Sequence, residues 1–175
     1  DKANYILPLV LNNSSDDINI DKRQIFIVPD IVTPYLYFEK SGYQPYKAEE
    51  GGETSFDITI PISMPMENNW DFDCTLKINP ELLTAYNETN HADFELLPDN
   101  CYTLAEKVSF VSGKSTSIAT VKINIPDDLK FGKYMLPIEL SECSMPTFDI
   151  KEGTNTYLAG IVYPVSYTHL RAHET

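Results

Sequence analysis

The stretch Thr54-Ser-Phe-Asp-Ile-Thr-Ile-Pro-Ile-Ser63 alternates apolar and polar residues, and its even-numbered positions from Phe56 to Ile62 are all apolar. An alternation of period two predicts a β-strand with one buried face. Residues 70–78 repeat the pattern, with apolar side chains at every even position from Trp70 to Ile78. These two stretches therefore predict the central strands of a β-structure, and Trp70 is expected to be buried with the others.

Five further segments have the composition of short strands, and turn residues separate them. They cover residues 35–39, 107–111, 117–125, 133–141 and 157–163. One interruption predicts a helix, because Asn79 can cap it, Pro80 suits its first position and Glu81 adds an acid to its first turn. Seven short strands favour an all-β fold, an immunoglobulin-like two-sheet β-sandwich with one short crossover helix, over a closed barrel.

The chain also repeats itself. Residues 4–11 and 133–140 share the pattern Tyr-x-Leu-Pro-x-x-Leu, and self-similarity at a long period indicates tandem domains. We therefore expect residues 1–30 to be the C-terminal fragment of a preceding homologous domain, and 31–164 to be a complete β-sandwich domain. Residues 165–175 resemble a translated sequencing adaptor, so we expect this tail not to be native. The chain is then expected to be an internal piece of a longer protein.

The charge of the chain excludes one class of partner. Lys and Arg number 13 against 26 Asp and Glu, which gives a formal net charge of −13. Nucleic-acid binding requires a basic surface, so no nucleic acid is expected as a partner. No apolar run approaches the roughly 18 residues of a membrane span. Attachment to a membrane is therefore expected only through a lipid anchor on a preceding N-terminal segment.

The cysteines and histidines give little sign of a reactive site. Cys74, Cys101 and Cys143 are odd in number and widely spaced, which indicates neither a disulfide framework nor a zinc site. Cys74 is expected to be a small buried residue. Outside the tail the one histidine is His91, which lies in a polar stretch without a nucleophile motif and is expected to be solvated. No metal and no cofactor are expected.

Paired carboxylates require separate consideration because glycosidases use two of them. Asp71 and Asp73 lie two residues apart on one expected strand and resemble the beginning of the chitinase Asp-x-Asp-x-Glu string. Thr75 occupies the position that the catalytic glutamate of that string would need. We therefore expect a solvated strand face and no catalytic residue in this chain.

Several motifs in combination resemble a known family. In chain order they are Leu-Lys-Ile-Asn-Pro-Glu-Leu-Leu-Thr-Ala-Tyr-Asn at 76–87, Phe-Glu-Leu-Leu-Pro at 94–98, Tyr-Thr-Leu at 102–104, Gly-Lys-Ser at 113–115 and Tyr-Met-Leu-Pro at 134–137. The combination resembles the N-terminal sandwich domain of Bacteroidetes surface lipoproteins, a domain of unknown function. That domain precedes the barrel of chitinase-like endo-N-acetylglucosaminidases and occurs in tandem in surface glycan-binding proteins. The resemblance implies a location at the cell surface, anchored by lipid to the outer membrane, or secretion.

The same motif residues also have structural explanations. Tyr86 and Asn87 at a helix end can pack and cap, and Pro98 can set a turn. Pro137 within a strand predicts an edge or bulge position, because proline cannot donate a ladder hydrogen bond. These residues therefore specify a fold and do not by themselves predict an active site.

Aromatic residues are the candidates for a binding site. Planar rings stack on sugar faces at a low cost in side-chain entropy. Tyr37, Tyr43 and Tyr46 lie in the tyrosine-rich segment 35–46, and Trp70 is the fourth candidate. The alternative for the tyrosines is an edge strand and hinge that packs against the neighbouring domain of the same chain, and the alternative for Trp70 is burial.

The leading expectation is a non-catalytic accessory or glycan-binding domain of a cell-surface lipoprotein in a polysaccharide-utilisation system. One alternative is the N-terminal accessory domain of a secreted glycoside hydrolase whose catalytic domain lies further along the chain. A third interpretation is an adhesin-like structural surface protein that uses the sandwich for protein contacts.

Overall fold

The computed structural model describes residues 7–9, 25–27, 33–47, 54–126, 129 and 132–162. The tail at 165–175 lies outside the described residues. The chain divides into two compact units, Asp1–Thr33 and Pro34–Thr175. In the first unit, β1 (Leu7–Leu9) pairs antiparallel with β2 (Ile25–Ile27). That the first unit is the end of a second copy stays a prediction.

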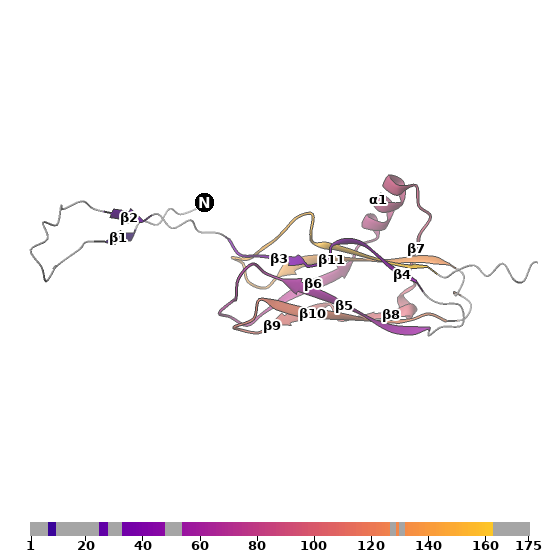
Figure 1. Ribbon diagram of the computed structural model, residues 1–175. Coiled ribbons are helices and arrows are strands. Elements are labelled where there is room, and N and C mark those ends of the chain that lie inside the picture. The colour runs from indigo at the N-terminus through magenta and orange to yellow at the C-terminus, as the bar shows by residue number, and fades with distance from the viewer. Residues whose placement is uncertain are drawn as a thin grey trace, which may run out of the picture. The chain divides into compact units, whose positions relative to one another are not determined.

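The second unit contains two facing β-sheets (Figure 1). The order of the five-stranded sheet is β12 (Asp149–Ile150), β3 (Tyr35–Phe38), β5 (Ser55–Ser63), β10 (Thr116–Asn124) and β8 (Tyr102–Leu104). The order of the other sheet is β4 (Gly42–Lys47), β13 (Thr156–Val162), β11 (Lys133–Cys143), β6 (Phe72–Ile78) and β9 (Lys107–Phe110), and β7 (Glu95–Leu96) also pairs with β11. The predicted all-β two-sheet sandwich is confirmed.

The alternating sequence of β5 explains how the core forms. β5 and β10 pair antiparallel along nine residues each, from Ser55 opposite Asn124 to Ser63 opposite Thr116. The isoleucines of β5 point inward and are at most 1% exposed. Each such side chain stabilises the fold by about 2 kcal/mol when it is fully buried. A shift of one residue would expose all of them, so the apolar face of β5 fixes the register of the strand.

The helix predicted at Asn79 is present as α1 (Pro80–Asn90). The Asn79 side chain accepts a hydrogen bond from the Glu81 N–H at 3.1 Å, which satisfies one of the free donors of the first turn. Leu83 packs with Met135 and Leu158 on the outer face of the six-stranded sheet, and α1 lies outside the layer that contains β11 (Figure 1). β11 and β13 are consequently buried on both faces, as their nearly continuous apolar sequence requires.

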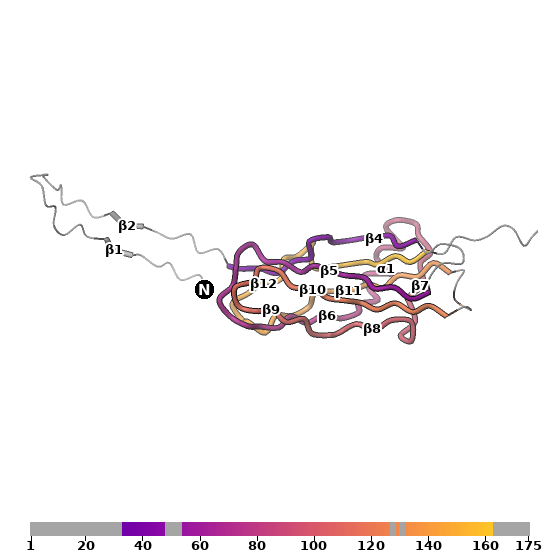
Figure 2. Tube along the Cα trace, turned by 60° about the horizontal axis from the view of Figure 1, so that its bottom comes forward, coloured from indigo at the N-terminus to yellow at the C-terminus, as the bar shows by residue number. Residues whose placement is uncertain are grey.

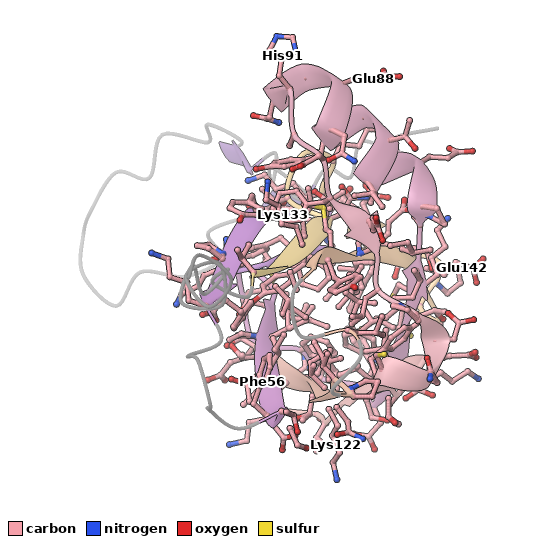
Figure 3. All side chains as sticks on the ribbon, turned by 90° about the vertical axis from the view of Figure 1, so that its right-hand side faces the viewer. Phe56, Glu88, His91, Lys122, Lys133 and Glu142 are labelled. Atoms are coloured by element: carbon pink, nitrogen blue, oxygen red, sulfur yellow. The ribbon has the colours of Figure 1, made fainter. Side chains whose placement is uncertain are left out.

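The residues after the helix hold its C-terminal end to the sheet. His91 caps α1 in the left-handed conformation, with φ 51°, and points away from the sheets into solvent (Figure 3). The Asn87 side chain donates to the Phe94 carbonyl at 2.8 Å and accepts from its N–H at 3.1 Å. The predicted solvated histidine and the packing role of Tyr86 are confirmed, whereas the capping role expected of Asn87 is wrong, because α1 runs on to Asn90 and its cap is His91.

The prediction for Pro137 is wrong, because β11 is neither an edge strand nor bulged at this residue. The register shift of β11 lies further on, between Leu140 and Glu142. On one side of β11, β6 ends opposite Ile138 and β7 pairs only with Tyr134 and Met135, so Pro137 faces the gap between two short partners. The missing proline N–H therefore breaks no ladder hydrogen bond, while the carbonyl accepts one from the Asn79 N–H at 2.9 Å.

Among the described residues, no helix has the length and apolar character needed to cross a bilayer.

Candidate functional site

Three turns meet at one end of the sandwich, opposite the end that carries α1 (Figure 2). They follow β5, β9 and β11 in the chain. A turn-bearing end of a sandwich is where binding residues are commonly placed, because the sheets hold the turns rigidly while their side chains remain free. The candidate site lies among these turns.

Asn68 holds two of the turns together although it is polar and only 2% exposed. Its side-chain amide donates to the carbonyl oxygens of Lys114 at 2.6 Å and Val111 at 3.3 Å. Its side-chain oxygen accepts from the Trp70 N–H at 2.8 Å, and its backbone carbonyl accepts from the Gly113 N–H at 2.8 Å. Gly113 has a φ of +80°, which favours glycine at this turn. One buried amide thus fixes both turns.

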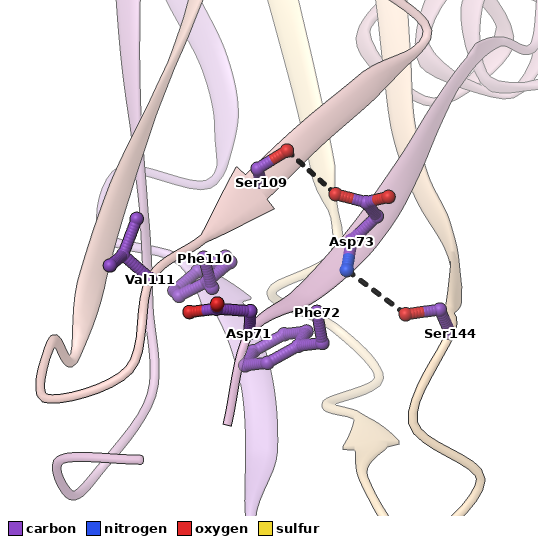
Figure 4. A pocket seen from close by; sticks show the side chains of 7 residues that line it. All are labelled: Asp71, Phe72, Asp73, Ser109, Phe110, Val111 and Ser144. Atoms are coloured by element: carbon purple, nitrogen blue, oxygen red, sulfur yellow. Dashed lines mark hydrogen bonds between the residues drawn. The ribbon is translucent and has the colours of Figure 1, made fainter. Parts of the chain in front are cut away.

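A hollow of about 430 Å³ opens at this end of the sandwich (Figure 4). Its size falls within the roughly 300–1,000 Å³ of small-ligand sites. The lining residues come from β6, from β9 and from the turns that follow β5, β9 and β11: Asp71, Phe72, Asp73, Ser109, Phe110, Val111 and Ser144. The rings of Phe72 and Phe110 stack, with their centres 4.7 Å apart and an angle of 8° between their planes. They give the hollow an apolar base.

Polar groups line the rest of the hollow. Asp73 Oδ1 accepts a hydrogen bond from the Ser109 hydroxyl at 2.6 Å, and the Asp73 N–H donates to Ser144 Oγ at 2.9 Å. Asp71 Oδ1 accepts from the Ser112 N–H at 2.7 Å. Each carboxylate has two oxygens and about four acceptor positions, so both retain capacity to accept from a ligand hydroxyl. The arrangement suits a neutral ligand with several hydroxyl donors.

Trp70 directly precedes Asp71, and the expectation that it is buried is wrong, because its side chain is 54% exposed. β6 begins only at Phe72, so the alternation of the strand does not extend to Trp70. The indole meets the ring of Phe148 edge-on at 6.4 Å, and Phe148 in turn meets Phe72 edge-on at 5.0 Å. Buried aromatic rings therefore support the exposed indole.

The structure places the three candidate tyrosines apart from one another and from Trp70. Tyr37 lies on β3 in the five-stranded sheet, and the Lys151 ammonium lies 6.0 Å from its ring centre and 5.0 Å from that of Tyr35. Tyr43 and Tyr46 both lie on β4, three residues apart, so their side chains take opposite faces of the sheet. The four candidates do not form one platform.

Tyr43 takes part in packing on the outer face. Its ring stacks on Tyr86 of α1 with centres 5.1 Å apart at 22°, and Phe94 lies 5.8 Å away. The ring also covers Gly160, where a Cβ would come within 2.3 Å of it. Burial, followed by the nearby Tyr86 hydroxyl, raises the pKa of Tyr43.

Tyr46 takes part in packing on the inner face. Its hydroxyl lies 2.5 Å from that of Tyr157, and its ring stacks near Phe56 at 6.1 Å. Burial and this hydrogen bond raise the pKa of Tyr157. Binding roles for Tyr37, Tyr43 and Tyr46 stay predictions, and the last two rings have little free face.

Cys74, predicted to be buried, is 0% exposed. Burial, and next the nearby Cys143 thiol, raise its pKa to about 12. Within the part of the chain that the structure describes, no group of three or more His, Cys, Asp and Glu residues could hold a metal ion.

Sequence reasoning missed the residues that shape the hollow. Ser109 and Ser144 lie far apart in the chain and meet only because β9 and β11 flank β6. Asn68 sits in a polar run in which nothing distinguishes it from the exposed Asn69. The Asp-x-Asp spacing was the available signal, since it places both carboxylates on one side of the strand.

Comparison with solved structures shows the same fold in proteins of Bacteroides. The chain superimposes on a candidate carbohydrate-binding protein of Bacteroides ovatus with a TM-score of 0.64 at 20% identity, over 75% of this chain and 37% of that one. It matches Bacteroides thetaiotaomicron EndoBT-3987, solved with a Man5GlcNAc product, with a TM-score of 0.60 at 21% identity, over 74% of this chain and 31% of that one. The chain thus spans less than half the length of these proteins.

A third structure widens the range of relatives. It is an auxiliary nutrient-binding protein of Bacteroides thetaiotaomicron, with a TM-score of 0.54 at 13% identity over 73% of this chain and 46% of that one. No curated protein sequence matches the chain significantly. One family model, described as "-like, N-terminal domain", matches residues 31–147, which is more than half of the chain. The chain therefore belongs to this N-terminal-domain family, as its motifs indicated, and shares its fold with Bacteroides proteins that include EndoBT-3987.

Proposed function

We propose that this chain is a non-catalytic accessory domain that binds glycans at the bacterial cell surface, as part of a polysaccharide-utilisation system. The observation that carries the proposal is an exposed, ring-supported Trp70 at the same end of the sandwich as a hollow lined by two carboxylates and two serine hydroxyls. Two proteins with this fold are a candidate carbohydrate-binding protein and an auxiliary nutrient-binding protein, which supports the same class of ligand.

The chemistry of the site fits a neutral sugar. A pyranose presents an apolar face that an indole can cover. Its hydroxyls can donate hydrogen bonds to carboxylates. An anionic sugar fits less well, because Asp71 and Asp73 line the hollow and the whole chain carries a formal charge of −13. Neutral hexose and N-acetylhexosamine glycans are therefore the proposed ligands.

The affinity is expected to be weak. The hollow is open and buries little ligand surface, so much of the contact energy offsets the entropy lost on association. A dissociation constant on the order of 0.1 to 1 mM is expected, equivalent to about 4 to 5.5 kcal/mol.

The test is a titration of the full chain with neutral host N-glycans, mucin fragments and plant polysaccharides, by calorimetry or affinity electrophoresis. Trp70→Ala and Asp73→Asn should each weaken binding by roughly tenfold, since about 1.4 kcal/mol of contact would be lost. Ile118→Ala is the matched control for Trp70, because Ile118 is 61% exposed on the other sheet. Asp57→Asn is the control for Asp73.

Two outcomes would overturn the proposal. If no glycan class binds at millimolar concentration, the domain is a spacer or a protein-contact module. If a glycan binds and both test variants bind as tightly as their controls, the domain binds sugars elsewhere and Tyr37, Tyr43 and Tyr46 become the next residues to change.

A second candidate function is the N-terminal accessory domain of a larger glycoside hydrolase. The match to EndoBT-3987 favours it, since the matched part makes up 31% of that chain. The sequence that follows this domain in the gene distinguishes the two, because a catalytic barrel with an Asp-x-Asp-x-Glu string would indicate the hydrolase.

A further inference from the structure

Cys74 and Cys143 lie directly opposite each other on neighbouring strands, although 68 residues separate them in the chain. β6 and β11 pair antiparallel, and the register makes these two residues cross-strand partners. Cys74 is fully buried, and Cys143 is half-buried and packs against the same core. Both side chains therefore point to the inner side of the six-stranded sheet.

The hydrogen bonds next to this pair show which type of cross-strand site it is. The Ser144 N–H donates to the Asp73 carbonyl at 2.8 Å, and the Asp73 N–H donates back to the Ser144 hydroxyl at 2.9 Å. Residues 73 and 144 therefore occupy a hydrogen-bonded site, and the alternation of an antiparallel ladder makes 74 and 143 a non-hydrogen-bonded site. At such a site the Cα atoms lie about 4.5 Å apart, which is within the range of about 4.4 to 6.8 Å that disulfides span.

We propose that Cys74 and Cys143 form an intramolecular disulfide when the folded chain meets an oxidising thiol–disulfide pool. The oxidant is a small-molecule disulfide such as glutathione disulfide. The Cys143 thiolate, on the more accessible side chain, attacks one sulfur of the oxidant and releases one thiol. Cys74 then loses its proton and attacks the Cys143 sulfur, which releases the second thiol and forms the protein disulfide. One disulfide is reduced to two thiols while two protein thiols are oxidised to one disulfide, so atoms and electrons balance.

The disulfide would join β6 to β11 directly under the hollow, because each cysteine is the chain neighbour of a lining residue, Asp73 or Ser144. This disulfide does not depend on glycan binding, since the strand register and the burial of both cysteines bring the two thiols together. Cys101 provides the control, because it is buried in the 3₁₀ turn Asp99–Cys101, and its thiol contacts Asn100 Oδ1 at 3.6 Å.

The test is incubation of the reduced, folded full chain with glutathione disulfide, followed by unfolding, maleimide labelling and intact mass measurement. The chain has three cysteines, so the oxidised protein should take up one maleimide instead of three. Peptide mapping should find residues 74 and 143 linked. Cys101→Ala should form the disulfide as the unchanged chain does, whereas Cys143→Ser should not. The melting temperature of the oxidised protein should rise by roughly 5–10 °C, because a long loop is closed without distortion.

Three results would overturn the proposal. They are a stable glutathione adduct on Cys143 with no internal disulfide, a disulfide that involves Cys101, and a lower melting temperature after oxidation. The last result would show that the folded sheet must distort to accommodate the bond.

Discussion

Replacing Asn68 with alanine tests the account of the turn-bearing end most directly. The change removes the amide that donates to the carbonyls of Lys114 and Val111, and the oxygen that accepts from the Trp70 N–H. A net hydrogen bond contributes about 1 kcal/mol, and a buried group left without a partner costs more. With one bond long at 3.3 Å, the free energy of unfolding should fall by about 2–3 kcal/mol. The free energy of unfolding of a single domain is about 5–15 kcal/mol, so the variant should remain folded.

The assay is urea denaturation followed in parallel by circular dichroism and by tryptophan fluorescence. Trp70 is the single tryptophan of the chain, so its fluorescence reports on the turn that Asn68 holds. Asn69→Ala is the matched control, because Asn69 is the adjacent residue of the same type and is exposed. A loss below about 0.5 kcal/mol for Asn68→Ala, the range of ordinary surface changes, would refute the reasoning. So would a Trp70 emission spectrum identical in the variant and the control.

Three further outcomes are expected. Gly160→Ala should cost about 1–3 kcal/mol, because the new Cβ would lie 2.3 Å from a Tyr43 ring atom, and a double-mutant cycle should show a smaller cost in a Tyr43→Ala background. Asn79→Ala should cost about 1 kcal/mol through loss of the α1 cap, as measured by urea denaturation against Glu81→Gln as control. Burial raises the pKa of the Cys74 thiol from 9.0 in the unfolded chain to about 12 in the folded chain. Between these pH values the unfolded chain has released the proton while the folded chain still holds it. The free energy of unfolding should therefore be highest below about pH 9 and fall as the pH rises towards 12. The slope should approach 1.4 kcal/mol per pH unit, and Cys74→Ala should reduce it.

The long strands could be predicted because their sequences repeat at a period of two over many residues. β5 and β10 each run for nine residues with apolar side chains on one face, and β6 follows the same pattern. An edge strand is the alternative that the sequence offers for segment 35–46, but the bounds of β4 could not be predicted, because Gly42-Tyr-Gln-Pro-Tyr-Lys47 has no apolar alternation and contains a proline, which suits an edge strand paired on one side only. β7, β8 and β12 are only two or three residues long, too short for any period to show.

The candidate site could be predicted only in part. Asp71 and Asp73 were paired correctly, because their spacing along one strand sets their common side. The tyrosines are close in the sequence, but without the bounds of β4 the opposite faces of Tyr43 and Tyr46 could not be predicted. The contacts of Asn68 depend on how two distant turns meet, which no local pattern encodes.

The pairing of the first and last strands determines when this domain can fold during synthesis. β3 pairs with β12 and β4 with β13, in parallel, so the beginning of the domain lies beside its end. Contacts between residues more than one hundred positions apart form late in folding, because forming them costs the conformational entropy of the intervening chain. Until residue 162 has left the ribosome, β4 cannot pair fully with β13, whereas β3 can already pair with β5. The six-stranded sheet is therefore completed only after β13 has been synthesised, although β5 and β10 can pair earlier.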